Sequence, residues 1–230
     1  MQNSYKLWKL FTQQTFPWFC EIVIAPMDIK FENLLKKVND LYTRYGIRSV
    51  TMDDISRELG ISKKTLYQYV KDKEDLVDKT MMYEFSSKRK FIEENKSRNA
   101  IEDIFFLNNM INRFIKESNP SKMYDLKKYY PAVFEKMAKL KRERTMNSMI
   151  QNYKKGKAEG LYRKEMDEEI LAKMYILRME SVSHDDVVSI SEFTSPKFIF
   201  EIFIYHIRGI ASKKGIEFLE NNLDKIQPVE

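Results

Sequence analysis

The sequence is poor in the residues that cross-link or interrupt a fold. A single cysteine, Cys20, occurs among 230 residues, which excludes a disulfide or a multi-thiolate metal site within one chain and fits the reducing cytoplasm. Only six glycines and six prolines occur, and this scarcity favours long helices over turn-rich sheets. Because 43% of the residues are hydrophobic and 32% are charged, we expect a folded globular protein of the all-α class.

Long apolar runs and clustered metal ligands are also missing. The most apolar stretch, 198–210, contains Glu201 and Arg208 and is shorter than the roughly 20 residues of a membrane-spanning helix. It predicts instead a helix buried on two sides, one against its own domain and one against a second subunit. The only histidines, His184 and His206, have no convincing ligand set at metal-binding spacing, so we predict no metal and no cofactor.

Positive charge is in modest excess, and its distribution does not locate a site. The formal net charge is +6 and the pI is about 9.1, a slight preference for polyanions. Residues 122–164 hold 13 basic and 4 acidic residues, whereas residues 28–94 hold 14 basic and 13 acidic residues. A basic run in the first segment predicts a solvated face, with an acidic-effector site or a non-specific DNA surface as alternatives. Its members are Lys136, Lys139, Lys141, Arg142, Arg144, Lys154, Lys155 and Lys157.

The first residues differ from the rest of the chain. Residues 1–26 are dense in aromatics, and Pro17 and Glu21 interrupt the apolar stretches, which fits neither a secretory signal nor a membrane span. Two interpretations of this N-terminal extension (1–27) are open: an appendage that packs on the body, or a segment upstream of a natural start at Met27. The second is slightly favoured because a well-formed domain begins directly after Met27.

A series of short predicted helices follows. A stripe of apolar residues with steps of three and four predicts a helix from Phe31 to Tyr45, which Gly46 ends. Thr51 is a good N-cap for a second helix with aspartates in its first turn. Gly60 breaks that helix, and Ser62 caps a third helix, which ends at residue 70. Two short helices joined by a tight turn over residues 51–70, with supporting helices before and after, form a helix-turn-helix pattern.

The outer face of the third helix has the chemistry of a DNA-reading surface. Lys63, Lys64, Thr65 and Gln68 are predicted to point outward while Leu66 anchors the helix to the core. Gln68 can contact adenine through two hydrogen bonds, Lys64 can reach guanine, and Ser62 and Thr65 can donate to phosphate or base edges. Thr51, at a helix N-terminus, is well placed for a phosphate.

The segment 51–76, TMDDISRELGISKKTLYQYVKDKEDL, resembles the signature of TetR/AcrR transcriptional regulators. The resemblance implies that Tyr67, Tyr69 and Lys73 clamp phosphates, and that Lys63, Lys64, Thr65 and Gln68 face bases. It further implies a cytoplasmic, non-enzymatic regulator, usually a repressor, that binds a palindromic operator as a homodimer. Lys64, Gln68 and Val70 depart from the residues that are frequent at their positions, and these departures leave the operator sequence open.

The resemblance also implies a division of the chain. A DNA-binding domain would cover 28–88, and a helical effector-binding and dimerisation domain would cover 89–230. The fourth helix, 73–95, would join them, and its movement would couple effector binding to the spacing of the two recognition helices. Further helices are predicted at 100–117, 123–130, 131–156, 167–183, 196–211 and 215–226, of which 167–183 and 196–211 are the expected dimer interface.

Methionine and aromatic residues in the second domain are candidates for an effector pocket, although such stripes usually form plain core. They predict a small apolar or amphipathic molecule as effector. The candidates are Phe105, Phe106, Met110, Phe114, Tyr124, Met146, Met149, Met174 and Met179.

Two other classes of function are alternatives to a DNA-binding regulator. The sequence has no nucleotide-binding glycine-rich loop, Gly-x-Ser-x-Gly elbow or zinc-helix motif, so an enzyme would be an all-helical one with scattered carboxylates. The other alternative is a helical partner-binding protein whose DNA-binding domain has lost activity. It predicts no salt-dependent DNA binding, whereas a repressor loses affinity steeply as salt rises.

Overall fold

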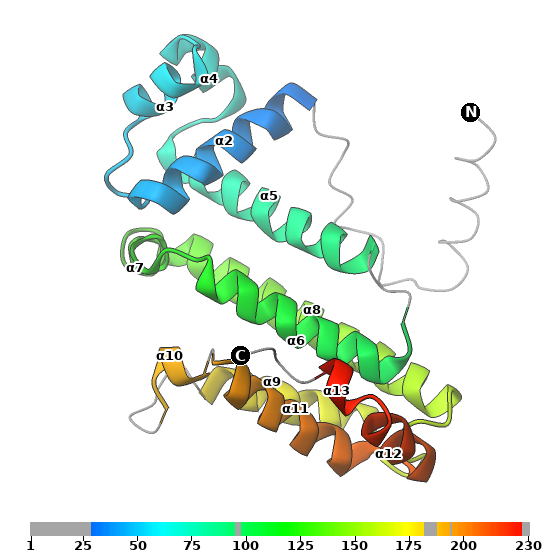
Figure 1. The fold of residues 1–230 in the computed structure, drawn as a ribbon. Helices are drawn as coiled ribbons and strands as arrows, with labels where there is room; N and C mark the ends of the chain where they lie inside the picture. Colours follow the sequence, from blue (N-terminus) through cyan, green and yellow to red (C-terminus); the bar gives the residue numbers. More distant parts are fainter. Residues whose placement is uncertain (1–28, 95–97, 182–187, 194, 227–230) are drawn as a thin grey trace, which may run out of the picture.

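The computed structural model describes residues 29–94, 98–181, 188–193 and 195–226, and its regular structure is helical (Figure 1). The expected all-α class, with an N-terminal helix-turn-helix domain and a C-terminal helical domain, is confirmed. The predicted N-terminal extension and His184 lie outside the described residues. The helices are α2 (Ile29–Tyr45), α3 (Met52–Leu59), α4 (Lys63–Tyr69), α5 (Lys73–Glu94), α6 (Ala100–Lys116), α7 (Pro120–Tyr129), α8 (Pro131–Ala158), α9 (Glu168–Ser181), α10 (Ile190–Phe193), α11 (Pro196–Ile210), α12 (Lys213–Glu220) and α13 (Leu223–Ile226).

Local capping fixes the helix-turn-helix. Thr51 and Asp54 form a capping box at the start of α3, with the Asp54 amide donating to Thr51 Oγ1 at 3.2 Å and the Thr51 amide to Asp54 Oδ2 at 3.0 Å. Gly60 ends α3 with φ of 67°, a left-handed conformation that suits glycine. Ser62 then caps α4 by accepting from the Thr65 amide at 3.1 Å. These local contacts fix where α3 begins and ends and where α4 begins, and Ile55 and Leu66 then hold the two helices in the core of the domain.

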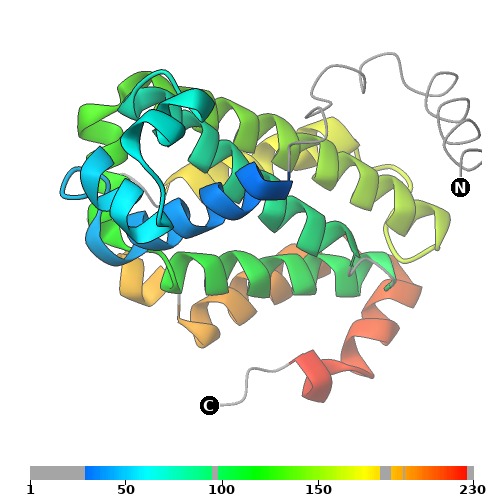
Figure 2. The ribbon, with the colours of Figure 1, turned by 90° about the horizontal axis from the view of Figure 1, so that it is seen from above.

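We call α2, α3, α4 and the first half of α5 the head. Its core is built from apolar side chains on these helices, and α2 lies along α5 (Figure 2). The same core continues into the next helices, because Leu126 of α7 and Val133 and Met137 of α8 are buried in it. The head therefore packs directly on α7 and α8, without an intervening linker.

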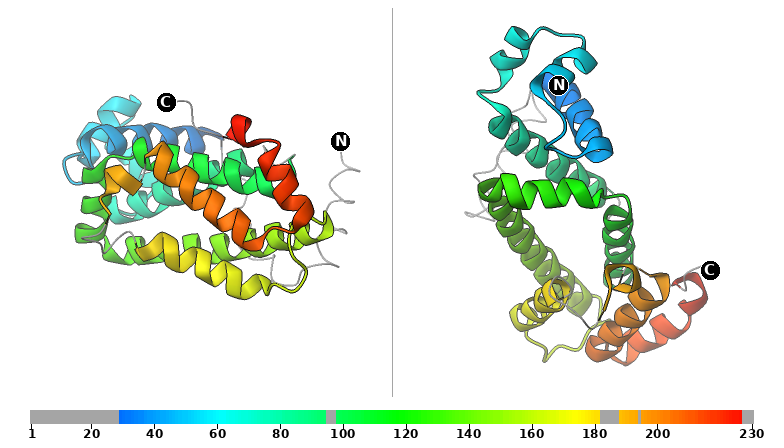
Figure 3. Two further views of the ribbon diagram at one scale, coloured as in Figure 1. Left: turned by 60° about the horizontal axis from the view of Figure 1, so that its bottom comes forward. Right: turned by 90° about the vertical axis from the view of Figure 1, so that its left-hand side faces the viewer.

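We call α6 to α13 the body. A second core lies among α6, α8, α9, α11 and the chain after α8, around fully buried aromatic residues such as Tyr153, Tyr175 and Phe203. Two views of the ribbon show α8 running the length of the body, with α9 beside it (Figure 3). Since α8 carries residues of both cores, it is the element that joins the head to the body.

Several predicted helix ends were wrong in the body. Helix α7 begins at Pro120 instead of residue 123, because Asn119 caps it by accepting from the Ser121 amide at 2.8 Å. The helix predicted for 215–226 is divided into α12 and α13, and the Asn221 amide closes α12 by donating to Glu217 O. The short helix α10 was not predicted. None of the described helices combines the length and apolar character needed to cross a lipid bilayer.

Candidate nucleic-acid interface

Helix α4 is divided into a buried and an exposed side. Leu66 is fully buried, and the predicted outward residues Lys63, Lys64 and Gln68 are exposed, with Thr65 partly so. Figure 1 shows α4 at the end of the head that faces away from the body. A short helix held by one apolar anchor, with polar side chains toward solvent, can enter a DNA groove without unpacking the head.

Acidic side chains at α3 reduce the positive field of this face. Lys63 Nζ lies 2.7 Å from Asp53 Oδ2 in an exposed ion pair between α4 and α3. The Thr51 hydroxyl donates to Asp54 Oδ2 at 2.6 Å, and hydrogen bonds from Thr51 lower the pKa of the Asp54 carboxyl. Lys64, by contrast, forms no ion pair with any residue in the described ranges. Lys64 is therefore the lysine of α4 that is most available to an incoming polyanion.

The two tyrosines of α4 lie in different surroundings. Tyr67 is 47% exposed, as a residue in contact with a partner molecule would be. The Tyr69 ring stacks on Phe31 of α2 with centroids 5.2 Å apart, and its backbone carbonyl accepts from Lys79 Nζ at 2.9 Å. Tyr69 thus joins α2, α4 and α5, and it is only partly open to solvent.

At the start of α5, Lys73 is held against the loop between α2 and α3. Its ammonium donates to the backbone carbonyl of Arg48 at 3.2 Å, and burial lowers its pKa. Arg48 itself was not predicted as a site residue. Its backbone amide donates to Asp125 Oδ2 at 2.8 Å, and its guanidinium lies 4.7 Å from the centre of the Tyr129 ring. The one signal for Arg48 in the sequence is its place three residues before the Thr51 cap.

The predicted basic run on α8 is not a single free surface. Several of its members pair with acidic residues of other helices: Lys136 with Asp78 at 2.8 Å, Lys155 with Asp103 at 2.6 Å, Lys157 with Glu168 at 2.8 Å, and Arg142 with Glu180. These pairs tie α8 to α5, α6 and α9. They neutralise much of the local excess that the sequence shows.

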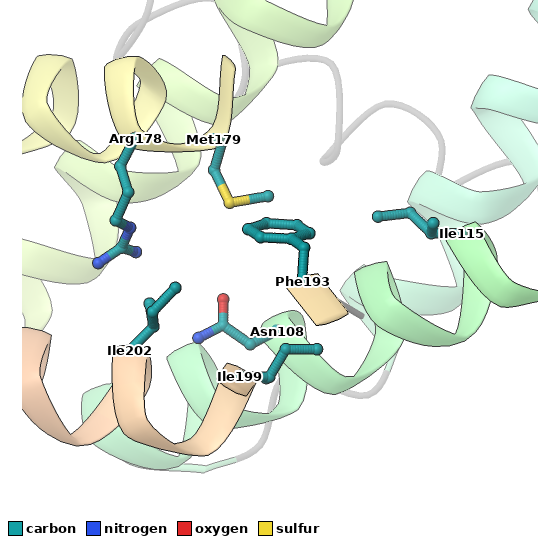
Figure 4. Close-up of a pocket in the computed structure, with 7 residues that line it drawn as sticks. All are labelled: Asn108, Ile115, Arg178, Met179, Phe193, Ile199 and Ile202. Atoms are coloured by element: carbon teal, nitrogen blue, oxygen red, sulfur yellow. The ribbon is translucent and has the colours of Figure 1, made fainter. Parts of the chain in front are cut away.

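The body has a small cavity between α6, α9, α10 and α11 (Figure 4). Its volume is about 30 Å³, and apolar side chains surround the polar ends of Asn108 and Arg178. The lining residues are Asn108, Ile115, Arg178, Met179, Phe193, Ile199 and Ile202. A space of this size holds a water molecule or two and is far below the several hundred Å³ of a drug-sized site.

Of the nine predicted effector residues, Met179 lines this cavity and the others lie elsewhere. Two of them, Tyr124 and Met174, are exposed on the outside of the protomer because their helices turn those sides to solvent. The remaining six are placed as follows: Phe105 against Phe203, Phe106 against Arg98, Phe114 against Lys88, Met149 fully buried in the body core, Met146 partly buried against that core, and Met110 half-buried on α6. The structure thus does not bring the nine residues together.

His206 belongs to the body core. Its Nε2 lies 3.1 Å from the Tyr153 hydroxyl, and its ring is 5.9 Å from that of Tyr175. Burial, and then the positive charge of Arg178, lower the pKa of His206 to about 4. Within the described ranges, no three His, Cys, Asp or Glu side chains gather where they could hold a metal ion.

An apolar stripe is open to solvent on α9. Ile170, Met174 and Leu177 follow one another at steps of four and three, and Leu177 is 67% exposed. The opposite side of α9 is buried through residues such as Leu171 and Tyr175. Tyr205 of α11 is also exposed, at 81%. Helices α9 and α11 lie on the side of the body away from the head (Figure 1).

Part of the sequence matches a known family of proteins. Residues 34–80 match the model of the bacterial regulatory proteins of the tetR family. Over these residues the chain is of the TetR family. The matched residues run from the buried face of α2 to α5 and include all of the helix-turn-helix. A search of curated proteins found no match.

Solved structures with the TetR fold resemble the chain over most of its length. A transcriptional regulator from Cytophaga hutchinsonii ATCC 33406 is 17% identical, with a TM-score of 0.62 over 80% of this chain and 100% of that one. The TetR-family protein CprB from S. coelicolor A3(2) is 16% identical, with a TM-score of 0.57 over 88% and 100%. The fatty acid degradation regulator FadR from Bacillus halodurans is 15% identical, with a TM-score of 0.55 over 76% and 95%. At these identities the likeness concerns the fold, in which a TetR helix-turn-helix precedes a helical body.

Proposed function

We propose that this TetR-family protein is a ligand-responsive transcriptional repressor that binds a palindromic operator as a homodimer in the cytoplasm and has no enzymatic role. The observation that carries the proposal is the division of α4 into one buried anchor, Leu66, and an exposed polar row. The residues assigned to DNA contact are Thr51, Ser62, Lys63, Lys64, Thr65, Tyr67, Gln68, Tyr69 and Lys73, with residues 28–88 as the DNA-binding domain.

Roles within this set follow from position and chemistry. Lys64 and Gln68 are exposed on α4 and can reach base edges in the major groove. Tyr67 and Lys73 would contact phosphates. Arg48, whose backbone carbonyl accepts a hydrogen bond from the Lys73 ammonium, would add positive charge next to Lys73. The Thr51 hydroxyl is already engaged in the capping box. The backbone N–H groups at the N-terminus of α3, which Thr51 caps, would therefore contact the phosphate in its place.

A second copy of the chain is the proposed occupant of the exposed apolar stripe on α9. In a monomer, the exposed side chains of Ile170, Met174 and Leu177 contribute no hydrophobic stabilisation. Burial of these three side chains in an interface would be favourable. Two copies related by a two-fold axis would present two α4 helices to two half-sites, which accounts for a palindromic operator. Residues 89–230 would thus serve dimerisation as well as effector binding.

The effector is proposed to bind inside the body. The cavity beside Asn108 and Met179 has apolar walls and two polar groups, the composition of a site for an apolar or amphipathic molecule. Its volume of about 30 Å³ requires helices α9, α10 and α11 to move apart when an effector enters. Such a movement would change the position of the head through α8, because α8 contributes side chains to the head core and to the body core.

The test is DNA binding to the region upstream of the chain's own coding sequence, measured by fluorescence anisotropy and footprinting across a salt series. We expect tight binding, a palindromic footprint, and an affinity that falls steeply as salt rises. Tyr67→Ala and Lys73→Ala should each weaken binding about tenfold or more, and loss of the Lys73 ammonium should also reduce the salt slope by about 1.

Lys213→Ala is the matched control, because Lys213 is exposed on α12, far from the head. Circular dichroism must show that all variants are folded. If the folded wild-type dimer binds neither the upstream region nor any duplex selected from random sequence at low salt, the repressor proposal is wrong. The body would then carry the function alone.

A further inference from the structure

Cationic and aromatic side chains alternate on the surface of α7 and of the loop between α2 and α3. We call Arg48, Tyr129, Lys128 and Tyr124 the cationic strip. The Arg48 guanidinium lies 4.7 Å from the centre of the Tyr129 ring, and Lys128 Nζ lies 5.4 Å from the same centre. Lys128 Nζ also lies 5.2 Å from the centre of the Tyr124 ring and donates to the Tyr124 hydroxyl at 2.8 Å. The four side chains therefore form one continuous row.

The positive charge of the cationic strip is open to solvent. Its four residues are exposed, and neither Arg48 nor Lys128 forms a side-chain ion pair with the residues that the structure describes. Asp125 of the same helix is buried, and its carboxylate accepts a hydrogen bond from the Arg48 backbone amide. Contact with an aromatic ring holds a cation in place without neutralising its charge. The strip therefore presents two positioned cations to an anionic partner.

The tyrosine hydroxyls of the strip add hydrogen-bond donors between the cations. The Tyr124 hydroxyl accepts from Lys128, and the Tyr129 hydroxyl accepts from Arg48. Because a phenolic hydroxyl can accept and donate at the same time, each of them keeps a proton for an acceptor outside the protein. A row of cations and hydroxyl donors matches the phosphates that follow one another along a nucleic-acid strand, whereas a single small anion would use only part of it.

The cationic strip is continuous with the residues assigned to DNA contact. The Arg48 carbonyl accepts from Lys73 Nζ at 3.2 Å, and Asn119 Nδ2, at the start of α7, donates to Thr43 O of α2 at 2.9 Å. Figure 1 shows α7 at the same end of the molecule as the loop that leads into α3, and Figure 3 shows α7 between the head and the layer of α9 and α11. With a second copy on α9, each α7 therefore lies between its own head and the two-fold axis.

We propose that the cationic strip binds phosphates of the operator segment that lies between the two half-sites. In a symmetric complex this spacer DNA passes the two-fold axis, where the strips of both protomers would face it. Phosphate contacts carry no base readout, so they would strengthen binding whatever the base sequence of the spacer. The inference rests on the proposed repressor function and adds to it a DNA contact made largely by the body, outside the helix-turn-helix.

A double-mutant cycle between protein and DNA tests the contact, on the operator that the footprint identifies. Lys128→Met should weaken binding to this operator at least about fivefold and reduce the salt slope by about 1 per protomer. In a second duplex, methylphosphonates replace the phosphates between the half-sites and remove their charge. Wild type and Lys128→Met should bind this duplex equally. Lys213→Met removes an exposed lysine at the opposite end of the body (Figure 1) and should match the wild type on both duplexes.

Tyr124→Phe keeps the ring and removes the hydroxyl, and it should weaken binding to the unmodified operator about twofold to threefold. The proposal is overturned if folded Lys128→Met binds that operator as the wild type does, or if its loss persists on the duplex with the neutral spacer. A loss that disappears only when methylphosphonates lie outside the half-sites also overturns it. Lys73→Ala should weaken binding with either spacer, and a wild type that binds no duplex refutes the repressor function itself. Failure of the strip and failure of the repressor function are therefore distinguishable.

Discussion

Replacement of Glu84 by glutamine keeps the size of the side chain and removes its charge. We expect Glu84→Gln to lower the free energy of unfolding by about 2–3 kcal/mol at pH 7. Burial alone would raise the pKa of this carboxyl, but Lys122 and Lys88 more than compensate and hold it at about 2, against an ordinary value of 4.5. That difference corresponds to about 3 kcal/mol of preference for the charged form in the folded protein.

The lysine partner limits the loss. The pKa of Lys122 is lowered, because the effect of burial, which disfavours the ammonium, is larger than the opposite effect of the Glu84 carboxylate. Without the carboxylate, Lys122 gives up its proton more readily, and the amide of the new glutamine can still accept a hydrogen bond. The destabilisation should therefore stay at or below the 3–5 kcal/mol typical of a broken buried pair.

The dependence on pH separates this electrostatic effect from a packing defect. A carboxyl whose folded-state pKa is depressed stabilises the protein fully above pH 4.5, and the contribution is lost as pH falls toward 2. Urea unfolding followed by helical circular dichroism should show the difference between wild type and Glu84→Gln shrinking to about half at pH 3. Asp78→Asn, which breaks a more exposed pair with Lys136, should cost less than about 1 kcal/mol. An equal loss for Glu84→Gln at pH 7 and pH 3 would refute the electrostatic reasoning.

Three further predictions follow from single contacts. Gly156→Ala would place a Cβ 2.0 Å from Cδ2 of the Tyr162 ring. It should lower the free energy of unfolding by about 1–3 kcal/mol and the thermal unfolding midpoint by several degrees. An unchanged midpoint would contradict the packing described for α8. Leu177→Glu should turn the proposed dimer into a folded monomer in light scattering after size-exclusion chromatography, and a persisting dimer would locate the interface elsewhere. Thr51→Ala removes one half of the capping box with Asp54 and should lower the free energy of unfolding, measured with a chemical denaturant, by about 1 kcal/mol. Thr51→Ser keeps the hydroxyl and should retain most of that stability.

The head could be predicted closely because its helix ends depend on near neighbours in sequence. Thr51 and Asp54 are three residues apart, as are Ser62 and Thr65, and Gly60 adopts its left-handed conformation where the turn requires it. Such signals need no knowledge of tertiary structure. The same holds for the anchor Leu66, whose burial follows from the spacing of apolar residues.

The body could be predicted less well because its contacts connect distant parts of the chain. Lys155 pairs with Asp103 across 52 residues, so a basic run in sequence becomes a series of interhelical ion pairs. Lys122 of α7 pairs with Glu84 of α5 across 38 residues in the same way. Methionine and aromatic side chains on α6 to α9 occur on outer and inner faces alike, and composition alone does not tell Met174 at the surface from Met179 at the cavity.

The sharing of α8 between the two cores has a consequence for cooperativity. Met137 is buried with the head and Met149 with the body, on one uninterrupted helix of 28 residues. Opening the head would expose apolar side chains of α7 and α8 to water, and melting α8 would remove one wall from each core. We therefore expect the chain to unfold as a single unit, with the amides in the middle of α8 among the slowest to exchange their hydrogens with solvent. A fragment that ends at residue 88 would lack Leu126 and Val133. Part of the hydrophobic core that stabilises the head would therefore be missing from it.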